Sequence, residues 1–361
     1  MGGEAFRTFL SDWRAVLQVR LDEAVDRITS IPSVLGVVIG GSVGGGAPWP
    51  LSDIDLLPVF KDGEAAAGRH AVEGVRQSLL TRWAAEGVRT PLDVGWLCFE
   101  RREVEAALAD PPAALVGRCD DARWLHSADK AFGGQGAGAG AGGQLAVGLA
   151  AWFTEARFLP TVVADRTRRA LEARERAWCA LWAMLSSGDA AEGAASRLAA
   201  FGGATLGWVL ATWGVRDCSY ARILTRFERA AQVRGRTDLV AALHAVFDLD
   251  VDQCLARLAA APAWLRERAV RQLAARAAVR DGVTAEGNGR DVLYVFSNQE
   301  RRHGTAPFAS WVGLDAPLSL TTRRARRLWQ VIQALESGDP PARPSPALTS
   351  GGGGAVGAMP P

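Results

Sequence analysis

The chain has 361 residues, of which 48% are hydrophobic and 22% charged, and its formal net charge is +2. This length is typical of two domains, and the composition is that of a globular protein. Five scattered cysteines without a C-x-x-C pair argue against a disulfide framework and against a zinc site.

The charge is unevenly distributed along the chain. Residues 1–132 carry 14 basic and 19 acidic side chains, whereas residues 133–280 carry 19 basic and 13 acidic ones. The first residues lack the apolar run of a signal peptide, and no apolar run approaches the ~20 residues that span a bilayer. We therefore expect a soluble, cytoplasmic protein with no membrane partner.

Hydrophobic periodicity predicts a set of helices and strands in the first third of the chain. Apolar residues recur at spacings of three or four in the helical segments, and short apolar runs mark the strands. The predicted order is a helix over 4–30, strands over 34–39 and 53–60, a helix over 64–86, a strand over 88–99 and a possible strand over 121–127.

Composition predicts an α+β protein whose sheet-containing domain precedes a helical bundle. The segment "GGQGAGAGAGG" contains no side chain that can pack, which is typical of a flexible linker. A strand over 291–296 and a helix over 320–338 are expected near the end of the chain. The predicted units are a first domain over 1–132, the linker over 133–143, the helical bundle over 144–280, a small C-terminal extension over 281–338 and a disordered tail over 339–361.

A glycine-rich stretch, "VVIGGSVGGGAPWPLSDIDLLPVF", lies between the first two predicted strands. A Walker A loop would need a lysine at its end, and no lysine occurs before Lys61. A dinucleotide fingerprint would run directly into a helix, which Pro48 and Pro50 prevent here. Neither of these phosphate-binding motifs fits the stretch.

Two carboxylates follow the glycines on one strand. Side chains alternate along a strand, so Asp53 and Asp55 point the same way and Ile54 points into the core. Glycines at 40 and 41 let the backbone approach phosphate oxygens, and the Ser42 hydroxyl can donate a hydrogen bond to them. Such carboxylates can hold Mg²⁺ against a triphosphate.

This pattern, G-G-S followed after ten residues by D-I-D, resembles the signature of the polymerase-β-type nucleotidyltransferases, over residues 30–130. That family uses a third carboxylate on a neighbouring strand, for which "TPLDVGWL" supplies Asp93. The resemblance implies transfer of an NMP from an NTP, with ATP the expected nucleotide, to an acceptor hydroxyl with Mg²⁺ as cofactor. It implies Asp53, Asp55 and Asp93 as catalytic residues and metal ligands, and Gly40, Gly41, Ser42 and Ser52 as cofactor-binding residues.

The sequence departs from this family in one respect. Many relatives have an arginine or lysine in the loop, but residues 42–52 contain no cation. The charge of a triphosphate would then be neutralised by Mg²⁺ and by arginines from elsewhere, with Arg101, Arg102, Arg168 and Arg169 as candidates. Trp49 either stacks on the base or covers the loop.

The acceptor is less defined than the reaction. A small molecule, such as an antibiotic or a metabolite, is the leading expectation, and RNA or a protein hydroxyl are alternatives. The excess of arginine in the helical part favours an anionic or neutral acceptor over a polycationic one. The competing interpretation is a catalytically silent relative that binds nucleotide and acts as a regulatory or antitoxin-like module.

Overall fold

The fold is seen in a computed structural model of the chain. The residues that it describes are 2–87, 90–95, 97–109, 124, 135–138, 140–187, 191–215, 222–247, 252, 256, 263–279, 282–285, 287–292 and 318–337.

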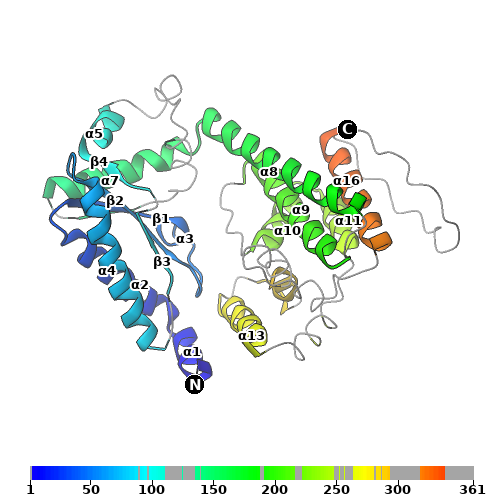
Figure 1. Cartoon of the computed structure of the whole chain (residues 1–361), viewed down its shortest axis with the longest axis horizontal. Helices are drawn as coiled ribbons and strands as arrows, with labels where there is room; N and C mark the ends of the chain where they lie inside the picture. Colours follow the sequence, from blue (N-terminus) through cyan, green and yellow to red (C-terminus); the bar gives the residue numbers. More distant parts are fainter. Residues whose placement is uncertain are drawn as a thin grey trace, which may run out of the picture.

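The chain forms two lobes, and this arrangement confirms the α+β class (Figure 1). The first lobe contains a small mixed sheet with helices on both of its faces. The second lobe is helical and is reached through the long helix α8 (Pro160–Ser187). None of the helices in the described part of the chain combines the length and the apolar character that a bilayer crossing requires.

The sheet is built around a central antiparallel pair. β1 and β2 pair antiparallel, β5 adds antiparallel to the other side of β1, and β3 and β4 pair parallel with β2 at successive positions. The strands are β1 (Val34–Gly40), β2 (Ile54–Phe60), β3 (Leu92–Val94), β4 (Phe99–Glu100) and β5 (Gln135–Ala137).

The single strand predicted over 88–99 is wrong in detail, because the structure divides it into β3 and β4. β3 pairs with residues 54–56 of β2, and β4 pairs with Val59 and Phe60. The interruption coincides with Pro58, which has no N–H to donate to a ladder. The short β3 nevertheless contains the predicted Asp93.

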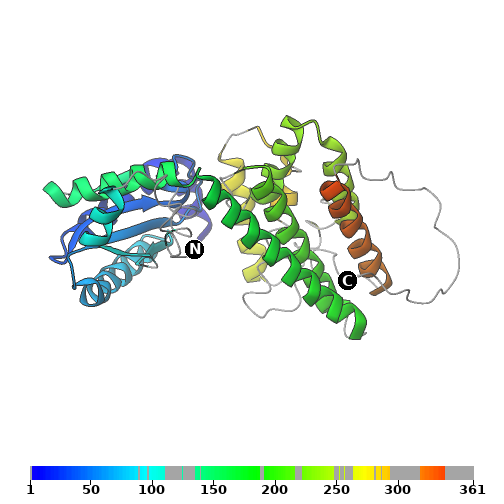
Figure 2. The same cartoon turned by 90° about the horizontal axis from the view of Figure 1, so that it is seen from above.

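Alternation along β2 produces two separate cores. Ile54, Leu56 and Phe60 pack on one face, and Leu57 and Val59 pack on the other; all five side chains are fully buried. The first face is covered by α2 (Trp13–Thr29) and α4 (Ala65–Ala85), and the second by α5 (Arg101–Ala109) and α7 (Gly140–Ala156), so that α4 and α7 lie on opposite sides of the sheet (Figure 2).

The predicted first helix is broken into two. α1 (Gly2–Ser11) ends before Asp12, whose backbone is not helical, and α2 begins at Trp13. Ser11 and Asp12 are residue types that favour helix ends over helix interiors, which accounts for the break. Apolar residues of both helices, among them Phe6 and Trp13, still reach the same core.

The glycine-rich segment predicted as a linker over 133–143 is wrong where it is described. Residues 135–137 form the edge strand β5, and α7 begins at Gly140 and packs on the sheet. A Cβ at Gly142 would overlap the Leu35 carbonyl, and one at Gly136 would overlap the Val147 backbone nitrogen. The glycines therefore permit close contact between backbones, and the first lobe continues to the end of α7.

The second lobe has one continuous core. Buried residues of α9, α10 and α16 belong to it, among them Phe201, Phe227 and Leu328. The bounds of further helices in this lobe are α9 (Ala191–Thr212), α10 (Ile223–Val233), α11 (Thr237–Phe247), α13 (Ala263–Ala277) and α16 (Leu318–Ser337).

Two predictions for the end of the chain are corrected. The helix predicted over 320–338 is present as α16, but it packs in the core of the bundle and not in a separate extension. Residues 291 and 292 are helical, where a strand over 291–296 was expected. The predicted tail over 339–361, residues 293–296 and most of the possible strand over 121–127 lie outside the described residues.

A buried polar network joins the two lobes at the glycine-rich loop. Trp49 of the loop is 7% exposed, and the Arg276 guanidinium of α13 lies 5.5 Å from the centre of its ring. Arg276 pairs with Asp291 at 3.4 Å, and Asp291 accepts hydrogen bonds from the backbone N–H and the hydroxyl of Thr225. Trp49 therefore covers the loop and is packed against the helical lobe.

Candidate metal site at the glycine turn

The predicted glycine loop is a tight turn at the end of β1. β1 ends at Gly40, the single helical turn α3 (Gly41–Gly44) follows, and the Ala47 N–H donates to the Ser42 carbonyl at 3.0 Å. Gly41 has a φ of 62°, a conformation that costs a side-chain-bearing residue about 1–2 kcal/mol. A glycine at this position therefore lets the chain turn directly out of the strand.

Ser52 fixes the far end of the loop. Its hydroxyl oxygen accepts a hydrogen bond from the Trp49 N–H at 2.9 Å and lies 2.7 Å from the Ser42 hydroxyl. Ser52 is 2% exposed, so these two contacts hold the start of β2 against the glycine turn. The structure thus gives Ser52 a role in shaping the turn, whereas the predicted contact of Ser42 and Ser52 with a cofactor stays a prediction.

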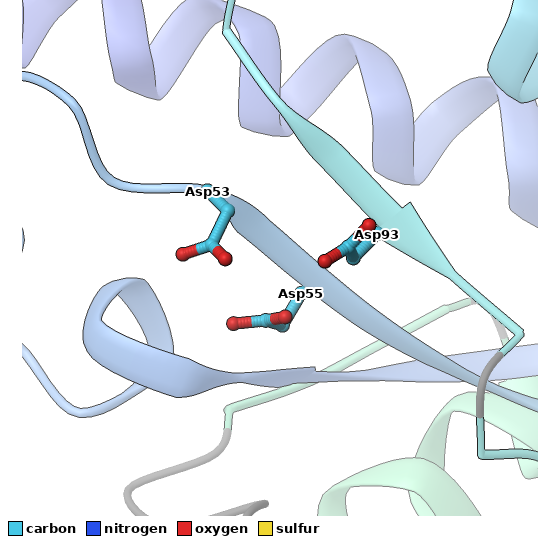
Figure 3. Close-up of side chains that lie close together, drawn as sticks. All are labelled: Asp53, Asp55 and Asp93. Carbon is cyan, nitrogen blue, oxygen red and sulfur yellow. The ribbon is translucent and has the colours of Figure 1, made fainter. Parts of the chain in front are cut away.

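Strand register brings the three predicted carboxylates together. Gly40 of β1 is paired with Asp55 of β2, and Asp55 is paired with Asp93 of β3, so the three residues form a row across the sheet. Asp53 precedes β2 and lies on the same face. One carboxylate oxygen from each of Asp53, Asp55 and Asp93 lies within 4.8 Å of the other two, and all three side chains gather next to α3 (Figure 3).

The turn and the cluster are in direct contact through Gly41. A Cβ at this position would collide with the Asp55 carboxylate oxygen Oδ2. Gly41 therefore serves two purposes, the left-handed turn and the space for the Asp55 carboxylate. Asp53 and Asp93 are exposed and Asp55 is half-buried, so the cluster is open to solvent.

The local electrostatics are those of a carboxylate cluster. Loss of hydration raises the pKa of Asp53 above the usual 3.8, and the nearby negative charge of Asp93 raises it further, while a backbone hydrogen bond opposes the shift. A divalent cation would relieve this repulsion. Hard carboxylate oxygens are the ligands that Mg²⁺ prefers, so the donor set and its spacing fit this ion.

A cation that no sequence motif indicates, Arg76, lies beside the cluster. Arg76 of α4 donates to the Leu92 carbonyl at 3.3 Å and to both oxygens of Glu73, at 2.7 and 2.8 Å. These contacts lower the pKa of Glu73 to about 2. They also raise the pKa of Arg76, to which the charge of Asp93 adds. Arg76 thus holds the residue before Asp93 against α4.

The four arginines suggested from the sequence lie on α5 and α8, and Arg101 is the first residue of α5. Arg168 and Arg169 lie on α8 in ion pairs with Asp165, and Arg102 at the start of α5 pairs with Glu100. Arginines of α2, α10 and α13 lie near the cation-free loop instead. Only the tertiary fold brings these helices to the loop, so no local pattern could have selected them.

Comparison with known proteins adds no family to this description. Neither the models of protein families, nor the curated proteins, nor the solved structures contain a match to the chain. The geometry of the turn and its carboxylates is therefore the basis on which a function can be proposed.

Proposed function

We propose that the protein is a Mg²⁺-dependent nucleotidyltransferase that transfers an NMP from an NTP to an acceptor hydroxyl and releases pyrophosphate. The observation that carries the proposal is the convergence of Asp53, Asp55 and Asp93 within 4.8 Å beside a glycine turn. A turn that exposes backbone N–H groups next to clustered carboxylates suits a nucleoside triphosphate bound through a metal.

Each part of the site has a defined task in this reaction. Asp53 and Asp55 would hold Mg²⁺, which would neutralise triphosphate charge, while Asp93 accepts the proton of the acceptor hydroxyl. The turn at Gly40 and Gly41 lets phosphate oxygens approach the backbone closely. Most of the rate gain comes from positioning and charge stabilisation, since the protein makes no covalent bond to the substrate.

The reaction is an in-line displacement. The acceptor oxygen forms a bond to the α-phosphorus while the bond from that phosphorus to the α–β bridging oxygen breaks, and pyrophosphate leaves with the bonding electrons. The proton of the acceptor hydroxyl passes to Asp93, which is exposed and can release it to water. The acceptor is a small molecule in this proposal.

The test uses each of the four NTPs labelled at the α-phosphate, with Mg²⁺ and with fractions of small molecules, RNA or protein as acceptor. Asp55→Asn keeps the size of the side chain but removes its charge, so we expect transfer to be abolished while the circular dichroism spectrum is unchanged. The matched control is Asp26→Asn, an exposed carboxylate on α2, which should retain full activity.

The labelled fraction identifies the acceptor class. Undiminished transfer by the Asp55→Asn protein would contradict the assignment of the site. Absence of both transfer and Mg²⁺-dependent NTP binding in the unaltered protein would contradict the proposed activity.

A further inference from the structure

A cavity that differs chemically from the carboxylate cluster lies between the two lobes. It has a volume of about 920 Å³, and its walls come from α2, from the loop over 46–49 and from α10 and its flanks. Asp53, Asp55 and Asp93 do not line it. The cavity is therefore separate from the carboxylate cluster, although the loop that leads to Asp53 forms one of its walls.

Arginines are the charged residues among the described residues that line this cavity. Arg14 contributes from α2, and Arg226 and Arg229 contribute from α10. Arg222 and Arg234 flank α10 and also line the cavity. The spacing of residues 222, 226 and 229 places three guanidinium groups on one face of a helix.

The walls strengthen the field of these arginines. Leu17, Ile39 and Val43 line the same space, and apolar walls lower the local dielectric and focus the potential of one-signed charge. Arginines of α2 and of α10 line the same space, so both lobes would attract an anion bound there. Arginine is also the side chain whose planar fork best matches the geometry of a phosphate.

We propose that this cavity binds a small phosphorylated molecule whose phosphate groups are held by Arg14 and by the arginines of α10. The apolar part of the wall would accommodate the rest of such a ligand. The proposal goes beyond the nucleotidyltransferase activity and does not depend on it, since no residue of the carboxylate cluster takes part.

The size of the cavity and its aromatic residues favour a small molecule over a nucleic-acid strand. A volume near 920 Å³ lies within the range of ~300–1,000 Å³ that is typical of small-ligand sites. Single-stranded nucleic acids need exposed aromatic platforms for their bases. Trp13 and Trp49 line the cavity but are only 3% and 7% exposed, so they do not offer such platforms.

The base of the cavity is held in place before any ligand arrives. Thr225, which lines the cavity, is bonded to the fully buried Asp291, and Asp291 is paired with Arg276 next to Trp49. This network fixes α10 against the loop of the other lobe. The arginines of α10 therefore start from a fixed backbone, which lowers the entropic cost of binding an anion.

The experiment separates this cavity from the metal site. Binding of inorganic tripolyphosphate to the full chain is measured by calorimetry in the presence of EDTA, in a protein that also carries Asp53→Asn and Asp55→Asn. We expect saturable binding that persists under these conditions. In this background Arg14→Gln and Arg229→Gln, both at exposed side chains, should each weaken it about tenfold, as loss of a charged hydrogen bond predicts.

The matched control is Arg176→Gln, an exposed arginine on α8 that does not line the cavity, which should bind tripolyphosphate normally. Equal weakening in this control would show that only the overall charge matters and would overturn the proposal. Absence of saturable binding would overturn it too. Tighter binding of a 5′-phosphorylated RNA oligonucleotide than of tripolyphosphate, sensitive to Arg229→Gln, would assign the cavity to nucleic acid instead.

Discussion

At Gly41 the backbone conformation and the position of a carboxylate depend on each other. The positive φ starts the turn, and the missing side chain leaves space for the Asp55 carboxylate. A side chain at this position would have to displace Asp55, because the colliding oxygen belongs to a side chain that can move only by leaving the cluster.

The Gly41→Ala variant tests this dependence. We expect a loss of about 1–2 kcal/mol in unfolding free energy from the left-handed backbone, and in addition a loss of Mn²⁺ binding, measured by electron paramagnetic resonance. Gly63→Ala is the matched control, since Gly63 has a φ of 73° but open space around it. It should lose similar stability and keep the metal. Equal metal affinity in the two variants would contradict the role of Gly41.

The raised pKa of Asp53 predicts how the stability of the protein depends on pH. Its pKa is raised in the folded protein, so its ionisation lowers stability as the pH rises from 3.8 through the folded-state pKa. Asp53→Asn removes this loss. We expect a higher midpoint of thermal unfolding than for the unaltered protein at pH 7 without metal, and a smaller difference as the pH is lowered towards 3.8.

With saturating Mg²⁺ the unaltered protein should have a higher midpoint of thermal unfolding than Asp53→Asn, because the ion stabilises only the protein that retains its carboxylate. Thermal scans with EDTA and with Mg²⁺ measure both effects. A variant that is less stable than the unaltered protein in EDTA would contradict the raised pKa that loss of hydration and the charge of Asp93 give to Asp53.

At the scale of elements, the glycines around β5 and α7 bring helix and sheet backbones into contact. Gly142 faces the Leu35 carbonyl, which cannot move without disturbing β1. Leu149 and Phe153 of α7 are fully buried on the same face of the sheet. Burial of each such side chain contributes about 1.5–3 kcal/mol to the free energy of unfolding. This contribution depends on the close distance between α7 and the sheet.

Two glycine-to-alanine changes in helices should therefore have opposite effects. Gly142→Ala should lower the unfolding free energy by about 1–3 kcal/mol through overpacking. Gly74→Ala in α4, where nothing lies within 4 Å, should raise it by up to about 1 kcal/mol through helix propensity. Urea denaturation measures both. Stabilisation by Gly142→Ala would show that α7 does not need the close contact.

The parts of the fold that local patterns determine were predictable from the sequence. The strands at 34–39 and 53–60 and the helix at 64–86 follow from hydrophobic periodicity, and alternation along β2 placed Asp53 and Asp55 on one face. The position of Asp93 on a strand next to Asp55 was implied by the family resemblance, whereas the parallel pairing that aligns the two residues is seen only in the structure.

The features that sequence analysis missed or assigned wrongly are those that depend on tertiary contacts. Glycines in a flexible linker and glycines pressed between a helix and a sheet have the same local sequence, so residues 133–143 were misassigned. The packing of the two lobes brings Arg14 and Arg229 to one cavity, which no local sequence pattern could predict. The division of β3 from β4 required knowledge of which strand lies beside Pro58.

At the scale of the whole molecule, a buried ion pair of the helical lobe lies at the junction with the first lobe. Arg276 and Asp291 both have fully buried side chains, and Arg276 lies next to Trp49 of the other lobe. Removing one partner of a buried pair leaves a charge in a medium of low dielectric, which costs about 3–5 kcal/mol, whereas replacing both by apolar residues often costs much less.

We therefore expect Asp291→Ala to lower the unfolding free energy of the full chain by about 3–5 kcal/mol. The Arg276→Met/Asp291→Leu double variant should lose markedly less. Urea unfolding followed by tryptophan fluorescence gives both values, and Trp49 makes this signal sensitive to the junction. A double variant at least as unstable as Asp291→Ala would show that the charges themselves stabilise the junction.

The place of β5 at the edge of the sheet determines where the two lobes can be separated. A fragment that ends at residue 132 would lack β5 and α7, and would expose the hydrogen-bonding groups of Val37–Ile39 along the open edge of β1. Open edges of this kind recruit strands from other molecules, so such a fragment would be prone to self-association. A fragment that continues through α7 to the start of α8 keeps β1 paired with β5. This fragment is the natural unit for isolating the carboxylate cluster.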